Sequence, residues 1–271
     1  MNFYIMSRGR AAKMTTWKNL PDEVRERTKI VTREADYLNY CRIYGNENVI
    51  LAPGEHGENY SNKFQWIMHD GMRDGLSKCV ILDDDLRFAT RVGEKFLSVV
   101  SKDQLIQVAD ALLTMEEELE DVPLVSLHPR QMAHVAPKVF KSNGKVICIQ
   151  GIGREWVGNL KVNQFPILAD VILNMYCLGK GWGNRLLTDV VQDHGSCQAP
   201  GGCSDTRTSA MQKEAVLAIA RKYPNYFKVS MKQPKTPWLT DENGTRWDFI
   251  GAWKKLYEDR PWSKEQYNDD F

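Results

Sequence analysis

The stretch Lys78-Cys-Val-Ile-Leu-Asp-Asp-Asp85 carries most of the information about the fold. Its apolar run is unbroken, which is typical of a strand buried on both faces of a parallel sheet. Three consecutive carboxylates follow that run. Ligands of open α/β sheets bind beyond the carboxyl ends of the strands. The stretch therefore predicts a central strand with a ligand site directly after it.

Other strands and amphipathic helices alternate on both sides of this stretch. Short β-branched and apolar runs predict strands at 3–6, 28–32, 49–52, 124–127 and 146–149, the last two paired antiparallel. Helical spacing predicts helices at 35–44, 62–72, 102–120, 167–178 and 209–222. Loops are expected at 86–100, 151–166 and 195–205. This alternation predicts an α/β fold with a mostly parallel central sheet over 1–230, and a short C-terminal extension over 231–271.

The composition excludes several classes of protein. Hydrophobic residues make up 42% of the chain and charged residues 26%, values that argue against disordered, collagenous and coiled-coil chains. No apolar run approaches the roughly 20 residues of a membrane span, and the N-terminus lacks the pattern of a signal peptide. Cys79, Cys148 and Cys177 sit in apolar runs, as free thiols do in a reducing compartment. We therefore expect a cytoplasmic protein with no membrane partner.

The carboxylates of Asp83, Asp84 and Asp85 should repel one another, so a structural role without a cation would be costly. Carboxylate oxygens suit hard divalent ions such as Mg²⁺ and Mn²⁺, which complete their ligand shells with phosphates and water. The other interpretation is a solvated turn after the strand. The buried strand that precedes the triplet favours the metal.

A second polar segment, Ser7-Arg-Gly-Arg10, follows the first expected strand. Arginine presents a fixed fork of donors, and two such groups around a flexible glycine suit a diphosphate or a pyrimidine base. The alternative is a basic surface turn. If both strands belong to one parallel sheet, this loop and the Asp triplet face each other across one crevice.

These two segments, together with Ala169-Asp-Val-Ile-Leu-Asn-Met-Tyr-Cys-Leu-Gly179, make the chain resemble the GT-A glycosyltransferases over roughly 2–230. With Lys222-Tyr-Pro224 added, it resembles more narrowly the bacteriophage enzymes that glycosylate modified bases in DNA, the group associated with TET/JBP-type pyrimidine hydroxylases. In the resembled family an acidic pair usually opens the third segment. Ala169 occupies the first of these positions here, which leaves Asp170 as the only acid.

The resemblance implies a metal-dependent glycosyltransferase with Mn²⁺ or Mg²⁺ as cofactor. It implies transfer of a hexose or pentose, such as glucose or arabinose, from a UDP-sugar to a 5-hydroxymethyl or 5-hydroxy pyrimidine, for example hydroxymethylcytosine, in phage DNA. Asp170 would be the catalytic base or orient the acceptor. The metal ligands would be Asp83, Asp85 and His194. The donor would be bound by Ser7, Arg8, Arg10, Lys63, Asp83 and Asp84.

Two features bear on a DNA acceptor. Residues 213–264 contain eleven Lys or Arg against six Asp or Glu, and four of the eight tryptophans, Trp238, Trp247, Trp253 and Trp262. Basic residues among aromatics suit an unstacked nucleic-acid strand, although the tryptophans could equally pin a C-terminal arm onto the core. An enzyme that acts on a base within a duplex has to flip it out, so an aromatic side chain is expected beside the acceptor. Trp156 and Trp182, in loops around Asp170, are the residues expected there.

Three alternatives stay open at this point. The first is a nucleotidyltransferase of related fold, which would usually carry a longer glycine-rich loop than Ser7-Arg-Gly-Arg10. The second is a glycosyltransferase for a small-molecule, glycan or protein acceptor. The third is a non-catalytic DNA-binding protein whose Asp triplet is a turn. For the favoured enzyme, we expect a monomer or a small homo-oligomer in the host cytoplasm during phage infection.

Overall fold

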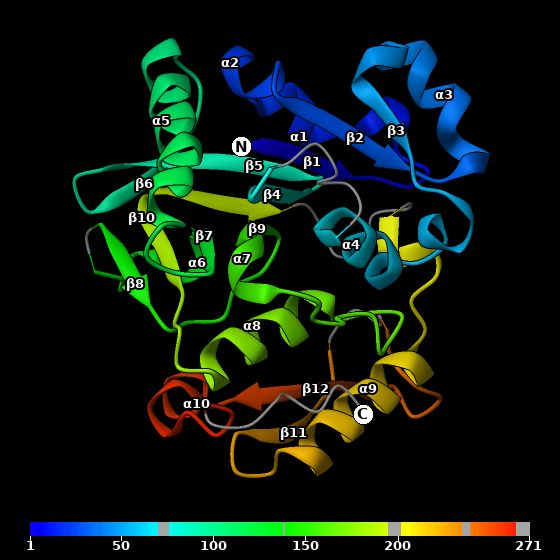
Figure 1. Ribbon diagram of the computed structural model, residues 1–271, viewed down its shortest axis with the longest axis vertical. Coiled ribbons are helices and arrows are strands. Elements are labelled where there is room, and N and C mark those ends of the chain that lie inside the picture. The colour runs from blue at the N-terminus through cyan, green and yellow to red at the C-terminus, as the bar shows by residue number, and fades with distance from the viewer. Residues whose placement is uncertain (70–75, 138, 195–201, 235–238, 264–271) are drawn as a thin grey trace.

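The computed structural model describes residues 1–69, 76–137, 139–194, 202–234 and 239–263 (Figure 1). The expected end of the helix at 62–72 and Trp238 of the basic, aromatic tail lie outside these residues.

One large mixed sheet crosses the described part of the molecule in the order β3-β2-β1-β4-β9-β7-β10-β5-β6, and β8 pairs with β10. The strands are β1 (Asn2–Met6), β2 (Thr28–Thr32), β3 (Val49–Leu51), β4 (Lys78–Asp83), β5 (Leu86–Val92), β6 (Lys95–Ser98), β7 (Leu124–Pro129), β8 (Phe140–Ser142), β9 (Ile149–Gly153) and β10 (Arg185–His194). β1 to β4 are parallel to one another, and β9 runs antiparallel between β4 and β7. β7 and its parallel neighbour β10 therefore run in the same direction as β4. The predicted α/β fold with a mostly parallel central sheet is confirmed.

Helices cover both faces of the sheet. The helices are α1 (Thr15–Asn19), α2 (Asp22–Arg25), α3 (Glu34–Tyr44), α4 (Tyr60–His69), α5 (Lys102–Glu118), α6 (Arg130–Ala133), α7 (Arg154–Val157), α8 (Ala169–Gly179), α9 (Ser209–Lys222) and α10 (Trp253–Asp259). Short 3₁₀ turns add η1 (Ala11–Lys13), η2 (Asn46–Asn48), η3 (Gly54–Gly57) and η4 (Gly202–Asp205). Figure 1 shows α3 and α5 on one side of the sheet and α4 and α8 on the other. Among the described residues, no helix combines the length and the hydropathy that crossing a bilayer requires.

β4 is buried on both faces, as its apolar run predicts. Val80 and Leu82 belong to the core cluster under α3 and α5, whereas Ile81 belongs to the cluster under α4 and α8. All three side chains are 0% exposed. The strand is thereby fixed on both sides, and the residues that follow it emerge at the carboxyl edge of the sheet.

The expected loop at 86–100 is wrong, because β5 and β6 form an antiparallel hairpin there. The strand expected at 146–149 begins only at Ile149, since Cys148 has a φ of 65°, which a regular strand does not accommodate. The loop expected at 151–166 begins instead as the end of β9 and α7. At Gly151 a Cβ would lie 2.7 Å from the end of the Met115 side chain and 3.3 Å from the Val125 carbonyl oxygen, so glycine allows β9 to pack closely against both.

The C-terminal region packs against the helices of the core. β11 (Phe227–Lys232) and β12 (Arg246–Gly251) form an antiparallel pair on α9, and α10 packs on α8. Trp262 is 8% exposed and lies so close to Gly179 that a Cβ on that glycine would come 1.8 Å from the indole. Trp253 of α10 and Trp262 both pack against the buried core cluster, and they thereby hold the C-terminal region on the core. The expected division at 230 falls inside β11, and that division stays a prediction.

Candidate active site

The carboxyl ends of β1 and β4 meet where the order of the strands reverses. The chain runs from β1 outward to β2 and β3 and then returns to β4 on the other side of β1, and such a switch point opens a crevice in an α/β sheet. A cavity of about 320 Å³ lies there. It is lined by every residue expected to bind the donor, hold a metal or act on the acceptor hydroxyl: Ser7, Arg8, Arg10, Lys63, Asp83, Asp84, Asp85, Asp170 and His194.

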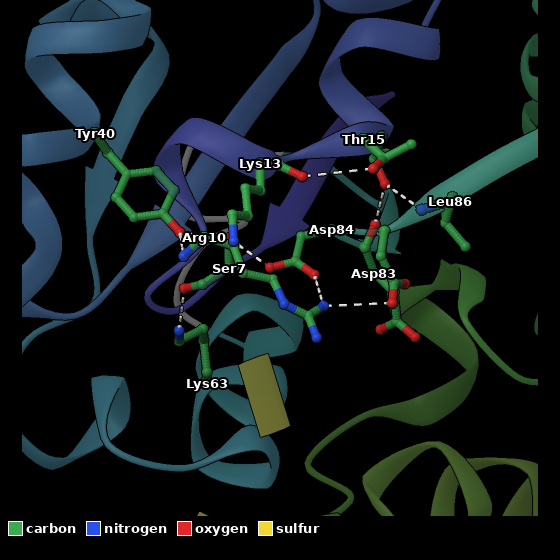
Figure 2. Close-up of polar contacts among 11 residues, drawn as sticks. Ser7, Arg10, Lys13, Thr15, Tyr40, Lys63, Asp83, Asp84 and Leu86 are labelled. Carbon is green, nitrogen blue, oxygen red and sulfur yellow. Dashed lines mark hydrogen bonds and ion pairs between the residues drawn. The ribbon is translucent and has the colours of Figure 1, made fainter. Parts of the chain in front are cut away.

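The middle residue of the triplet, Asp84, is clasped by the β1 loop. The Arg10 guanidinium lies 2.7 Å from one oxygen of Asp84, and the Ser7 hydroxyl donates to the other at 2.6 Å (Figure 2). Tyr40 completes the clasp, because its hydroxyl accepts from the Arg10 backbone N–H at 3.0 Å and lies 2.6 Å from the Ser7 hydroxyl. Burial raises the pKa of Asp84, and Arg10 lowers it in part. Asp84 and Arg10 therefore satisfy each other inside the protein.

Asp83 has different surroundings. Burial raises its pKa well above the ordinary value, and the charges of Asp85, Asp170 and Asp84 raise it further. Arg10 also reaches Asp85, at 3.3 Å, and this carboxylate is 24% exposed. Asp83 and Asp170 thus form the part of the pocket in which negative charge accumulates.

The backbone around the triplet is fixed by one buried threonine. The Thr16 hydroxyl donates to the Asp83 carbonyl at 2.6 Å and accepts from the Leu86 N–H at 2.8 Å. Its own N–H donates to the Asp84 carbonyl at 3.2 Å. On the β1 side, the Lys63 ammonium donates to the Ser7 carbonyl at 2.9 Å. Both loops of the crevice are therefore held in one geometry.

Asp170 enters the pocket from the first turn of α8, which follows Leu168 in a left-handed conformation with φ 71°. Burial raises the pKa of Asp170. The charges of Lys145 and Arg207 and the N–H of Val171 oppose that shift without cancelling it. The Asp170 carboxyl group is thus partly buried, close enough to Asp83 for its charge to raise the pKa of that residue, and at the positive end of a helix dipole.

The donor set fits a hard divalent cation by its chemistry, because the repulsion among several partly buried carboxylates is relieved by such an ion. His194 ends β10 opposite Leu86, one residue beyond Asp85, so the sheet register brings it to the same edge. Within the described residues, however, no three His, Cys, Asp or Glu side chains form a ready metal-binding group. The expected ligands Asp83, Asp85 and His194 line one pocket without being arranged as a complete site.

Trp156 and Trp182 do not line this pocket. Their rings pack on each other with centroids 5.7 Å apart, and Trp182 also packs on Tyr176. The reason lies in the direction of β9: its last residue, Gly153, pairs with Lys78 at the start of β4, so the residues after it lie at the opposite edge of the sheet from the Asp triplet. The expectation that these tryptophans lie beside Asp170 is corrected accordingly.

The pocket also contains residues that the sequence did not reveal. Lys145, Arg207, Arg246, Asp248 and Phe249 line the side beyond Asp170. They come from three separated segments, and no local motif marks any of them. Only the basic balance of 213–264 gave a signal, and it did not single out Arg246.

Comparisons with known proteins complete the description of the site. No curated protein matches the chain. The crystal structure of mannose-1-phosphate geranyltransferase from Thermus thermophilus is 14% identical, with a TM-score of 0.43, over 71% of this chain and 75% of that one. The model of the TET-associated glycosyltransferase family matches residues 1–147, which include the β1 loop and the Asp triplet. Because this match spans more than half of the chain, the protein belongs to the TET-associated glycosyltransferase family and is a glycosyltransferase.

Proposed function

We propose that this enzyme transfers the sugar of a UDP-sugar to the hydroxyl of a 5-hydroxymethylpyrimidine in DNA. The family is one of glycosyltransferases that act on modified DNA bases. The observation that carries the finer proposal is the single pocket in which the β1 loop, the Asp triplet and Asp170 meet. A donor and an acceptor could react there side by side.

The β1 side of the pocket is proposed as the site of the nucleoside diphosphate. Arg8 lines it, and its guanidinium donates to the Glu58 carbonyl of the loop before α4. Lys63 is 4% exposed and lines the same wall. Arg10 is bound to Asp84, so its proposed role is to fix the β1 loop that contacts the donor and not only to bind phosphate. Arg8 and Lys63 then supply the positive charge that a diphosphate requires.

Asp83 and Asp85 would hold Mn²⁺ or Mg²⁺, and His194 lies near enough in the sheet register to join them. When bound, such an ion supplies charge stabilisation for the diphosphate leaving group. At this position the carboxylates of Asp83 and Asp85 would hold the ion and orient the donor. The crowding of acids around Asp83 supports this role, because it disfavours the protein without a cation.

Asp170 is proposed as the general base. The acceptor hydroxyl loses its proton to the Asp170 carboxylate while its oxygen bonds to the anomeric carbon, and the bond from that carbon to the diphosphate oxygen breaks. The raised pKa of Asp170 brings its basicity closer to working pH, where a general base is most efficient.

The test is mass spectrometry of nucleosides from hydroxymethylated and plain DNA incubated with a panel of UDP-sugars and Mn²⁺. We expect a sugar adduct on the hydroxymethylated nucleoside alone. Asp170→Asn should lower the rate by a factor of roughly 10²–10⁴, the contribution of a positioned base, and leave UDP affinity unchanged in calorimetry. Transfer to plain DNA, or only to a small glycan, would refute the proposed acceptor.

A further inference from the structure

The pocket has two walls of different origin. The β1 loop, α4 and the Asp triplet form one wall, on which the donor is proposed to lie. Lys145, Arg207 and Arg246 line the opposite wall, and we call these three residues the cationic wall. Of the three, only Lys145 falls within the residues that the family model matches. The family match therefore does not explain why this wall is basic.

Two of the three cations of this wall lie close enough to Asp170 to lower its pKa. Lys145 and Arg207 both act on the Asp170 carboxylate, and the Lys145 ammonium lies 5.7 Å from the centre of the Phe249 ring. Asp248 is the acid of the same wall, and its charge is met by the Lys232 ammonium at 2.8 Å. Three basic side chains thus line the pocket next to the proposed base, with Asp248 as an acid of the same wall.

Buried amides hold the Arg207 side chain and the backbone next to Lys145. Gln212 is 3% exposed, and its side-chain oxygen accepts from the Arg207 Nε–H at 3.1 Å. The turn before Lys145 is anchored by Asn184, which is 1% exposed and bonds both the N–H and the carbonyl of Gly144, at 3.0 and 2.9 Å. This support from buried side chains indicates that the position of these charges matters.

We propose that the cationic wall binds the phosphates of the DNA strand on either side of the target nucleotide, with the strand crossing β12 and the target base directed toward Asp170. This inference rests on the proposed function. The donor diphosphate already has Arg8 and Lys63 on the other wall, so the remaining anions of the reaction are the phosphates of the acceptor. Phosphate contacts from Arg and Lys fix the register of a strand without reading its sequence.

The test compares Arg246→Ala with Arg246→Lys and with a control, Lys95→Ala. Lys95 is exposed and pairs with Val92, at the end of β5 remote from the pocket. Binding of a single-stranded oligonucleotide with one hydroxymethylated pyrimidine is followed by fluorescence anisotropy across a salt series. UDP affinity and the melting temperature are measured on the same samples.

For Arg246→Ala we expect DNA affinity to fall roughly tenfold at low salt, and the slope of log affinity against log salt to decrease by about 0.7, the value for one lost phosphate contact on a single strand. Arg246→Lys should keep the slope, and UDP affinity should not change. An unaltered slope in Arg246→Ala, or a loss of UDP affinity instead, would overturn the inference. Wild-type protein that binds UDP but no DNA would overturn the proposed acceptor as well, whereas wild-type protein that glycosylates DNA while Arg246→Ala keeps its slope would refute the cationic wall alone.

Discussion

Asp83 and Asp84 are neighbours in the chain, yet the charge of their surroundings in the pocket differs. Asp84 points into the β1 loop, where Arg10 and Ser7 bind its two oxygens. Asp83 faces Asp85 and Asp170, whose charges raise its pKa. The difference teaches that neighbouring carboxylates of one acidic triplet can have different surroundings: the Asp84 oxygens are satisfied within the protein, whereas the Asp83 carboxyl group lies among other acids.

The sharpest way to test this division is Asp83→Asn. With Asp83 as the proposed metal ligand, removing its carboxylate should lower turnover by ~10³ or more, since the loss of a metal contact removes several kcal/mol of transition-state stabilisation. The free energy of unfolding at pH 8 without metal should be unchanged or higher, because one member of a repelling group is gone. Rate assays and denaturant unfolding check both halves. Near wild-type turnover would mean that Asp83 is not the ligand-binding acid.

Arg10→Ala tests the clasp around Asp84. The Arg10 and Asp84 side chains are 9% and 5% exposed, so this substitution leaves a buried charge without its partner. We expect the free energy of unfolding to fall by about 3–5 kcal/mol, measured in urea. Adding Asp84→Asn to that variant should restore part of the loss. A double variant no more stable than Arg10→Ala would contradict the clasp.

The pH dependence of stability should reveal the repulsion among the acids around Asp83. The folded pKa values of Asp83 and Asp170 are raised, so the native state binds more protons than the unfolded state, and stability falls as pH rises from about 4 through the raised values. A saturating divalent ion should oppose that loss, by about 2.7 kcal/mol at a hundredfold excess over its dissociation constant. Thermal unfolding with Mn²⁺ or with EDTA should therefore show a larger gain at pH 8 than at pH 5. Asp83→Asn is the matched control, and an equal gain in that variant would refute the assignment.

The smallest effect is expected for Tyr40→Phe. The Tyr40 hydroxyl, whose pKa burial raises to about 12, stays neutral and accepts the Arg10 N–H. Its removal leaves that donor unsatisfied, which should cost about 1–2 kcal/mol of unfolding free energy. The loss lies at the low end because the Ser7 hydroxyl keeps Asp84. Turnover at saturating donor should stay within a few-fold of wild type, and a large drop would show that the clasp also acts in catalysis.

Local signals predicted the parts of the fold that have strong local causes. β4 follows from its unbroken apolar run, and α9 begins and ends where Thr208 caps it and Pro224 stops it. β10 was missed because Thr188 and Asp189 interrupt its apolar residues, at the place where its register against β7 shifts. The irregularity interrupts the alternation of apolar and polar residues with a period of two, which is the pattern that identifies a strand in a sequence.

The candidate site likewise has a part that the sequence predicts and a part that it does not. The two loops after β1 and β4 were predictable, because each polar motif directly follows a recognisable strand. The pairing of Asp84 with Arg10 was not, since the partners lie far apart in sequence and nothing in a triplet says which carboxylate turns inward. The misplacement of Trp156 has a similar cause: the direction of β9 decides at which edge of the sheet that residue lies, and direction is a property of pairing rather than of local sequence.

The contact between Gly179 and Trp262 constrains how this enzyme can evolve. Asp170 lies at one end of α8 and Gly179 at the other, and the indole occupies the space that any side chain at 179 would need. A mutation to alanine at 179 is therefore expected to be acceptable only after a smaller residue has replaced Trp262. Among related sequences the two positions should vary together, and a lineage that enlarges one without reducing the other should displace the helix that carries Asp170.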